Sequence, residues 1–177
     1  MNITILTGAG ISAESGIGTF RDANGLWENH SIMDVATPEG FERDPELVHE
    51  FYNQRRRELL GTNMVPNDAH KALTRLQNND THQVTIITQN VDNLDRIAGV
   101  KNITEIHGNL FWIRCIHCGS RYPREEISLE VLPPHCPRCN GIMKTDGVMF
   151  GEPIPSDVLE KCQGESAIHG GGYFDIA

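Results

Sequence analysis

The sequence predicts an α/β protein: a Rossmann-like, doubly wound parallel sheet with a small cysteine module inserted into it. Three observations predict this class. Short segments rich in β-branched residues alternate with helical patterns, which is typical of parallel sheets covered by helices. A glycine-rich motif follows the first of these segments directly. Two C-x-x-C pairs, separated by 17 residues, interrupt the alternation and have the spacing of a metal site.

Three predicted strands share one property, which is that polar residues follow each of them. The strands and the residues after them are 2–7 before Gly8, 84–88 before Asn90 and Asp92, and 103–106 before His107. In parallel sheets ligands bind beyond the carboxyl ends of the strands. We therefore expect these polar residues to lie together at one edge of the sheet.

Helical patterns lie between the strands. Asp44 with Pro45 predicts the start of a helix that runs to about residue 60, and Asn67 or Asp68 can cap a second helix that follows. Two shorter helices are expected as well, one at 93–98 that stops at Gly99 and one that begins at Ser156 and ends near Gly164. These elements divide the chain into a Rossmann-like part with a helical insert (1–110), the cysteine module (111–144) and a return to the sheet (145–177).

Composition excludes several classes of protein. The chain has 177 residues, enough for one domain or one domain with an insert, and a formal charge of −9. No apolar run approaches the roughly 20 residues that span a bilayer, so we expect no membrane partner. Excess acidity disfavours sequence-independent binding to nucleic acid, and three arginines at 55–57 are too few to reverse this. The start of the chain has no basic leader, and thiols at metal spacing fit a reducing compartment, so we expect a cytoplasmic protein.

The glycine motif Gly8-Ala9-Gly10-Ile11-Ser12-Ala13 matches G-x-G-x-x-G/A. Its glycines allow a tight turn and let backbone N–H groups approach a pyrophosphate. Alone the motif is a weak signal, because a glycine-rich turn without a ligand has the same pattern. A nicotinamide-dependent dehydrogenase should also offer an acidic ribose ligand about 20 residues further on. Residues 18–27 read instead as a long loop, which disfavours a dehydrogenase.

The cysteine module carries a much stronger signal. Cys115, Cys118, Cys136 and Cys139 can supply four thiolates to one tetrahedral Zn²⁺. Four sulfur ligands leave no open position for water, so we predict a structural zinc and not a catalytic one. The alternative, cysteines without a metal or a redox pair, is disfavoured by two matched pairs at this separation. The fifth cysteine, Cys162, stands apart from them and is expected to be a simple thiol of the core or surface.

A series of longer motifs resembles the sirtuin family. In chain order they are residues 8–17 (GAGISAESGI), 19–21 (TFR), 88–92 (TQNVD), 105–108 (EIHG), the two cysteine pairs and 150–152 (FGE). Together they cover residues 1 to about 160. The stretch 35–41 (VATPEGF) and the pair Tyr52 and Arg55 are most similar to the bacterial class III branch, which removes acetyl and succinyl groups from lysine.

This resemblance implies NAD-dependent deacylation of lysines in protein substrates. NAD would be a co-substrate, with nicotinamide released and the acyl group transferred to ADP-ribose. His107 matches the family's catalytic histidine, a general base that draws a proton from a ribose hydroxyl. Histidine suits this task because its unperturbed pKa, about 6.5, lies near working pH. A lone histidine is more often structural, but the place of His107 inside this motif favours catalysis.

The resemblance also implies a set of NAD-binding residues: Gly8, Ala9, Gly10, Ala13, Thr19, Phe20, Arg21, Trp27, Gln89, Asn90 and Asp92. Asn90 and Asp92 match positions that contact the nicotinamide ribose and the carboxamide, although a strand-to-helix cap is an alternative role for both. Phe20 and Arg21 resemble the cofactor loop, in which the aromatic ring would shield the sugar after nicotinamide leaves.

Tyr52 and Arg55 lie three apart on a predicted helix and so share a face. A guanidinium with a phenol hydroxyl can bind the carboxylate that succinyl-lysine and malonyl-lysine carry and acetyl-lysine lacks. Without the resemblance, a solvated basic helix face would be the preferred interpretation. Ala23 is small enough to leave room for the longer chain. The resemblance also implies a segment that binds the substrate backbone as an added strand, which comprises Val148, Phe150, Gly151 and Glu152.

The sequence departs from the family in three places. Asp95 stands where the family usually has histidine, and residues 144–146 (KTD) replace an Arg-Pro approach to the substrate segment. After residue 164 the sequence becomes glycine-rich, and no strand ending in Gly-Thr-Ser follows, so we expect these 177 residues alone to bind NAD poorly. Two hypotheses stay open: an active deacylase, or a non-catalytic remnant that is a zinc-stabilised peptide-binding module.

Overall fold

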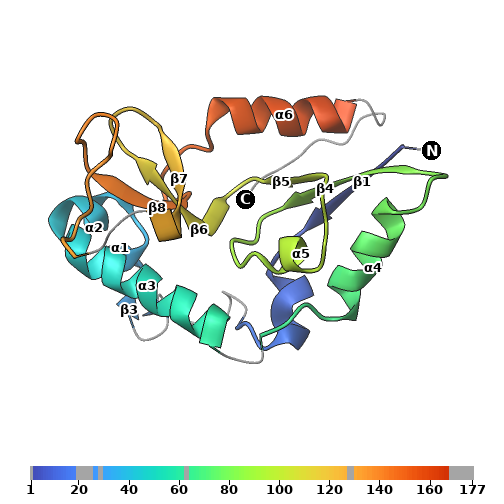
Figure 1. The fold of residues 1–177 in the computed structure, drawn as a ribbon, viewed down its shortest axis with the longest axis horizontal. Helices are drawn as coiled ribbons and strands as arrows, with labels where there is room; N and C mark the ends of the chain where they lie inside the picture. Colours follow the sequence, from blue (N-terminus) through green and yellow to red (C-terminus); the bar gives the residue numbers. More distant parts are fainter. Residues whose placement is uncertain (1, 19–25, 28–29, 62–63, 127–129, 168–177) are drawn as a thin grey trace.

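The computed structural model describes residues 2–18, 26–27, 30–61, 64–126 and 130–167 (Figure 1). The strands are β1 (Asn2–Thr7), β2 (Leu26–Trp27), β3 (His30–Ser31), β4 (Gln83–Thr88), β5 (Ile103–Glu105), β6 (Gly108–Cys115), β7 (Arg121–Pro123) and β8 (Met143–Gly147). The α-helices are α1 (Ile32–Val35), α2 (Pro38–Arg43), α3 (Pro45–Gly61), α4 (Asp68–Gln77), α5 (Leu94–Ile97) and α6 (Ser156–Ala167). Among the described residues there are also two 3₁₀ helices, η1 (Ala9–Ser15) and η3 (Arg124–Glu126).

A parallel sheet forms the centre of the fold, with the strand order β1-β4-β5. β1 pairs with β4 over its whole length, from Asn2 opposite Gln83 to Thr7 opposite Thr88. β5 pairs with the second half of β4. All three strands point the same way, so their carboxyl ends meet at one edge, as predicted.

Helices cover both faces of this sheet, as a doubly wound sheet requires (Figure 1). Successive residues of β4 point to opposite faces, so Ile86 packs under α4 with Leu73 while Ile87 packs under α6 with Cys162. Ile86 and Ile87 are fully buried. Burying side chains of this size contributes about 1.5–3 kcal/mol each. Cys162 is therefore a core residue.

The predicted helix starts are confirmed by their caps. The side chain of Asp44 accepts a hydrogen bond from the N–H of Leu47 at the start of α3. Asn67, and not Asp68, caps α4: its side chain accepts from the N–H groups of Ala69 and His70, and the His70 ring accepts in return from the Asn67 N–H. Satisfying donors that have no partner inside the helix stabilises a helix start by about 1 kcal/mol.

One helical prediction needs correction. α6 does not end at Gly164 but continues to Ala167. Glycine costs a helix only about 1 kcal/mol relative to alanine, and the packing of Val158 and Cys162 against the sheet holds the first two turns in place. At the end of α3, Leu59 packs against the core, whereas the next residue, Leu60, is 73% exposed.

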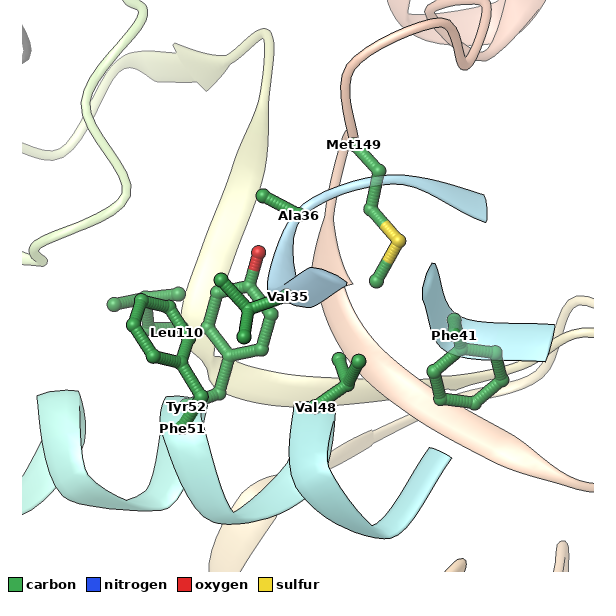
Figure 2. Close-up of a cluster of buried hydrophobic side chains, with 8 residues drawn as sticks. All are labelled: Val35, Ala36, Phe41, Val48, Phe51, Tyr52, Leu110 and Met149. Atoms are coloured by element: carbon green, nitrogen blue, oxygen red, sulfur yellow. The ribbon is translucent and has the colours of Figure 1, made fainter. Parts of the chain in front are cut away.

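Helices α1, α2 and α3 form a second layer beside the sheet that contains the cysteines (Figure 1). Figure 2 shows its core, in which Val48, Phe51 and Tyr52 rise from α3 toward Val35 and Ala36. The remaining members of this cluster are Phe41, Leu110 and Met149. Because Leu110 belongs to β6 and Met149 follows β8, the helical layer is fixed to the strands of the cysteine module.

The cysteine module is a three-stranded antiparallel sheet with the order β7-β6-β8. It joins the parallel sheet through Gly108, which has a φ of +80°. A Cβ atom at this position would lie 2.0 Å from the carbonyl oxygen of Asp146. Only glycine lets β6 begin this close to β8.

The predicted part boundaries at 110/111 and 144/145 fall inside β6 and β8, and the division into parts stays a prediction. None of the helices in the described ranges has the length and apolar character needed to traverse a bilayer.

Candidate functional site

The glycine motif lies directly beyond the carboxyl end of β1. Gly8 is extended, and the chain then turns into η1, so the expected helix start is a 3₁₀ helix and not an α-helix. A Cβ atom added to Gly10 would meet no atom within 4 Å, so open space borders the backbone there. A Cβ atom on Gly8 would lie 3.7 Å from the side-chain oxygen of Gln89. The backbone is thus accessible for a close approach by an anionic group, as the motif predicts.

Ser12, inside the motif, organises the polar side chains of this edge. It is only 1% exposed. Its hydroxyl donates to Oδ2 of Asp92 over 2.7 Å and accepts from Nδ2 of Asn90 at 3.2 Å. Asn90 Nδ2 also donates to the carbonyl of Gly8 at 3.1 Å. The predicted residues Gly8, Asn90 and Asp92 are therefore brought together, with Ser12 as the residue that joins them.

His70 extends this network into α4, and it is fully buried. The N–H of Asn67 donates to Nδ1 of His70 at 3.3 Å, so we assign the ring proton to Nε2. Nε2 lies 3.5 Å from the Ser12 hydroxyl oxygen. Hydrogen bonds then run in one direction, from His70 through Ser12 to the Asp92 carboxylate. Sequence reasoning missed both Ser12 and His70 as site residues.

Asp95 lies buried beside this network, at 4% exposure. Burial raises the pKa of Asp95, and the nearby carboxylate of Asp92 raises it as well. Oδ1 of Asp95 has no hydrogen-bond partner among the described residues. The departure from the family's usual histidine therefore places a second carboxyl group within the electrostatic reach of Asp92 and His70.

His107 follows β5 at the same edge of the parallel sheet and is partly exposed. Its Nδ1 lies 3.1 Å from the backbone carbonyl of Gln89. A carbonyl can only accept, so Nδ1 carries the proton and Nε2 keeps a free lone pair. The backbone carbonyl of His107 accepts from the N–H of Val148 at 2.9 Å. These two contacts fix the tautomer and the position of the residue.

The predicted substrate segment follows β8 and contacts both neighbouring parts of the molecule. Val148 donates to His107, and the N–H of Phe150 donates to the carbonyl of Ala36 at 2.8 Å. The Glu152 carboxylate accepts from the N–H of Met149 and from Nζ of Lys144, both at 2.9 Å. Lys144 thus holds the turn at Gly151, whose φ is +83°.

Tyr52 and Arg55 lie on one face of α3, as predicted, but in different surroundings. Tyr52 is buried in the core of Figure 2, and burial raises its pKa. Nη2 of Arg55 lies 2.6 Å from Oε1 of Glu58. The next arginine, Arg56, is buried and donates to the carbonyl of Leu110 at 2.6 Å. Burial lowers the pKa of Arg56 to about 9.

The other predicted site residues lie outside the described part of the chain or are placed only by their element or exposure. Thr19, Phe20, Arg21 and Ala23 lie outside the described residues. Trp27 belongs to β2, opposite His30 of β3. Ala9, Gly10 and Ala13 are exposed on η1, and Gln89 is exposed after β4. The assignment of individual binding roles to these residues stays a prediction.

The four cysteines of the two pairs converge as the spacing predicts. Their sulfur atoms all lie within 4.8 Å of one another, with Cys115 to Cys139 at 3.5 Å and Cys118 to Cys136 at 3.7 Å. A Zn–S distance near 2.3 Å implies about 3.8 Å between sulfurs of a tetrahedron, so the set fits one Zn²⁺. The N–H groups of His117 and Cys118 point at the Cys115 sulfur, at 3.4 and 3.5 Å, and would stabilise a thiolate there.

A cavity of about 370 Å³ lies behind the His107 backbone, between the cysteine module and α6. Ile106, Gly108 and Val148 line it, together with charged side chains. Its most buried charge is Asp146, whose carboxylate contacts Arg114 at 2.8 Å and also contacts Arg121. Residue 146 thus anchors the wall of the module behind the histidine.

The fold and the site together define a class of protein: a Rossmann-like α/β fold with a glycine-rich loop, a histidine at the same sheet edge and an inserted module whose four cysteines can bind zinc. Residues 8–169 match the sequence profile of the Sir2 family, and the chain belongs to this family. The resemblance to sirtuins is confirmed.

Curated relatives are described as NAD-dependent protein deacylases. One from Bdellovibrio bacteriovorus is 52% identical over 152 residues, which is 85% of this chain and 64% of that protein. One from Rhodopirellula baltica is 47% identical over 170 residues, which is 91% of this chain and 71% of that protein. This chain therefore spans about two thirds of the length of these relatives.

Solved structures agree with the fold. A Sir2 homolog in complex with NAD has a TM-score of 0.79 and 37% identity, covering 93% of this chain and 63% of that one. A Sir2 structure with a p53 peptide and NAD⁺ has a TM-score of 0.73 and 32% identity, covering 94% of this chain and 66% of that one.

Proposed function

We propose that the protein is an NAD-dependent protein-lysine deacylase, which transfers an acyl group from lysine to ADP-ribose and releases nicotinamide. The observation that supports this best is the tautomer of His107. With Nδ1 donating to the Gln89 carbonyl, Nε2 is left as the base. The glycine loop and the Ser12 network lie at the same sheet edge. Membership of the Sir2 family adds to this argument.

NAD, when bound, would supply a ribose carbon that is electrophilic because its bond to nicotinamide is weak. The protein's part is to position and to move a proton. Backbone N–H groups of Gly8 to Gly10 would take the pyrophosphate in the open space beside Gly10. Asn90 and Asp92 would orient the ribose and the carboxamide, because Ser12 and the Leu94 N–H already hold the Asp92 carboxylate in one rotamer. His107 Nε2 would accept a ribose hydroxyl proton.

Acylated lysines in protein substrates would enter from the side of the substrate segment. Val148 and Phe150 already use their N–H groups within the chain, so the carbonyls of this segment are the groups that a peptide would address. Tyr52 and Arg55 would recognise the carboxylate of succinyl or malonyl groups. A cytoplasmic location fits this proposal, because four reduced thiolates as zinc ligands suit a reducing compartment.

The test is nicotinamide release by the 177-residue chain with acetyl-lysine and succinyl-lysine peptides at high NAD concentration. We expect slow release that depends on the peptide, and His107→Ala should lower its rate by a factor of about 10² to 10⁴. His117→Ala is the matched control, because this histidine lies beside the cysteines. No release by the unmodified chain with either peptide would contradict the proposal and favour a peptide-binding module without catalysis.

The acyl selectivity has a separate test. Arg55→Met keeps the length of the side chain and removes the guanidinium. We expect it to abolish most nicotinamide release with succinyl-lysine and to spare release with acetyl-lysine, because only the former carries a carboxylate. Equal loss with the two peptides would mean that Arg55 supports the fold and does not select the acyl group.

A further inference from the structure

Three side chains follow one another along a single face of α3: Tyr52, Arg55 and Glu58. Each is three residues from the next, which places them one above another on the helix. Their exposure rises in the same order. Tyr52 is 5% exposed, the Arg55 side chain is 11% exposed and the Glu58 side chain is 37% exposed. The face thus runs from a buried phenol through a largely buried guanidinium to a carboxylate at the surface.

The Arg55 guanidinium already forms an ion pair within the chain, with the carboxylate of Glu58. Nη2 of Arg55 contacts Oε1 of Glu58 at 2.6 Å, and Gln54 donates to the same oxygen at 3.1 Å. On its inner side, the guanidinium carbon lies 5.6 Å from the centre of the Phe51 ring. Arg55 is therefore held between an aromatic ring of the core and an acidic side chain at the surface.

A succinyl or malonyl group ends in the same chemical group as Glu58, a carboxylate. Guanidinium binds carboxylates through paired N–H donors, and two carboxylates brought to one guanidinium repel each other. Glu58 is tethered three residues away, so its effective concentration at Arg55 is high. An acetyl group has no carboxylate, so the affinity for acetyl-lysine should not depend on whether Arg55 is paired with Glu58.

We propose that Glu58 is a specificity-determining residue, an internal competitor that an acidic acyl chain must displace from Arg55. In this role it lowers the affinity for succinyl-lysine relative to acetyl-lysine and so sets the ratio of the two activities. The inference rests on the proposed function and deepens it. It assigns the acyl preference to a balance between two carboxylates and not to the presence of arginine alone.

A positioning role for Glu58 would have the opposite consequence. If the carboxylate orients Arg55 for the acyl group, then its removal weakens the binding of succinyl-lysine. If it competes, its removal strengthens that binding. The sign of the change therefore separates the two roles.

The experiment measures peptide binding and does not require turnover. Two fluorescent peptides of one sequence, with acetyl-lysine or succinyl-lysine, are titrated with the unmodified chain, Glu58→Gln and Glu50→Gln, and Kd is read from anisotropy. Glu50 is an exposed residue of the same helix, so its variant matches the change in net charge. We expect Glu58→Gln to lower the Kd for succinyl-lysine by about three- to tenfold, since partly exposed ion pairs are weak. The Kd for acetyl-lysine and both values for Glu50→Gln should stay within about twofold.

Raising the salt concentration from about 0.05 M to about 1 M should bring the succinyl-lysine Kd values of the unmodified chain and Glu58→Gln closer together. Salt screens both the Arg55–Glu58 ion pair and the repulsion between Glu58 and the succinyl carboxylate. A higher or unchanged Kd for succinyl-lysine in Glu58→Gln overturns the inference. If the peptides bind as expected and no nicotinamide is released, the proposed reaction is wrong and the inference about Glu58 holds. If neither peptide binds to any of the three proteins, both are wrong.

Discussion

The zinc module and the polar network at the sheet edge are each built from a few side chains, but over different sequence distances. The sulfur contacts of the module join residues 18 and 24 apart. The contact between Ser12 and Asp92 joins residues 80 apart, and the one between Ser12 and His70 joins residues 58 apart. One site is assembled by two local turns and a metal, the other by the topology of the sheet.

This difference explains how each site can fail. The module has a small hydrophobic core, whose buried members are Ile113, Cys115, Cys136 and Met143. A domain part of this size depends on its metal, because binding contributes much of the folding free energy. The polar network at the sheet edge is supported by the hydrophobic core of the parallel sheet, so the fold around it should persist when one of its hydrogen bonds is lost.

The largest effect is expected from Cys118→Ser. Loss of one thiolate should release the zinc and melt the module, because structural zinc contributes on the order of 10 kcal/mol to the folding of such modules. Zinc content by elemental analysis should fall from one ion per chain to none. Amide hydrogen exchange should lose protection in β6 to β8 and retain it in β1 and β4. Cys162→Ser is the control and should keep the zinc. Loss of protection in β1 and β4 as well would mean that the two regions fold as one unit.

An intermediate effect is expected where α3 meets the module. Burial lowers the pKa of His49 from its ordinary 6.5 to about 4. Its Nε2 donates a hydrogen bond to the backbone carbonyl of Met143 at 2.8 Å. The unfolded chain binds this proton at a higher pH than the folded protein does, so stability falls as the pH drops from 6.5 toward 4. Between pH 7.5 and pH 5 the loss should be about 2 kcal/mol.

Urea unfolding of His49→Gln, compared with the unmodified chain at both pH values, checks this. Glutamine can keep a donor near the Met143 carbonyl but takes up no proton in this range. The variant should therefore lose about 2 kcal/mol less on acidification. Equal losses would show that other groups, such as the zinc ligands, account for the acid sensitivity.

The smallest effect is expected from Ser12→Ala, which removes a donor to a buried carboxylate and leaves the fold intact. We expect a loss of about 1–2 kcal/mol in the free energy of unfolding, measured in urea. Ser156→Ala, at an exposed position, should cost less than about 0.5 kcal/mol. A cost for Ser12→Ala as small as that of the control would mean that water satisfies Asp92 in place of the hydroxyl.

The sequence predicted the features that depend on spacing or on local caps. The cap at Asp44 reaches a partner three residues away, each C-x-x-C pair supplies two sulfurs three residues apart, and the glycine loop is one continuous motif, so pattern alone could locate these features. The three strands and their shared edge followed from alternation with helices. The Ser12 and His70 contacts depend on how η1 and α4 meet in space, and the only sequence signal was that both belong to predicted motifs or helices.

The three consecutive arginines at 55–57 show most clearly what the sequence alone could not predict. Arg55 is paired with Glu58, Arg56 is 5% exposed and Arg57 is exposed. Composition treats them as one basic run, but successive residues of a helix point 100° apart. Only Arg56 faces the module, where the Leu110 carbonyl and the Thr145 hydroxyl replace the water that it loses.

Gly108, at the junction of the two sheets, has a consequence for protein engineering. Because a Cβ atom there would lie 2.0 Å from the Asp146 carbonyl oxygen, the residue after the proposed base is fixed by packing and not by chemistry. His107 is therefore one peptide bond from the glycine at which an added Cβ atom would make the shortest contact among the described glycines. Grafting this histidine onto another scaffold means transplanting a junction between two sheets, since the side chain and the joint that aims it are inseparable neighbours.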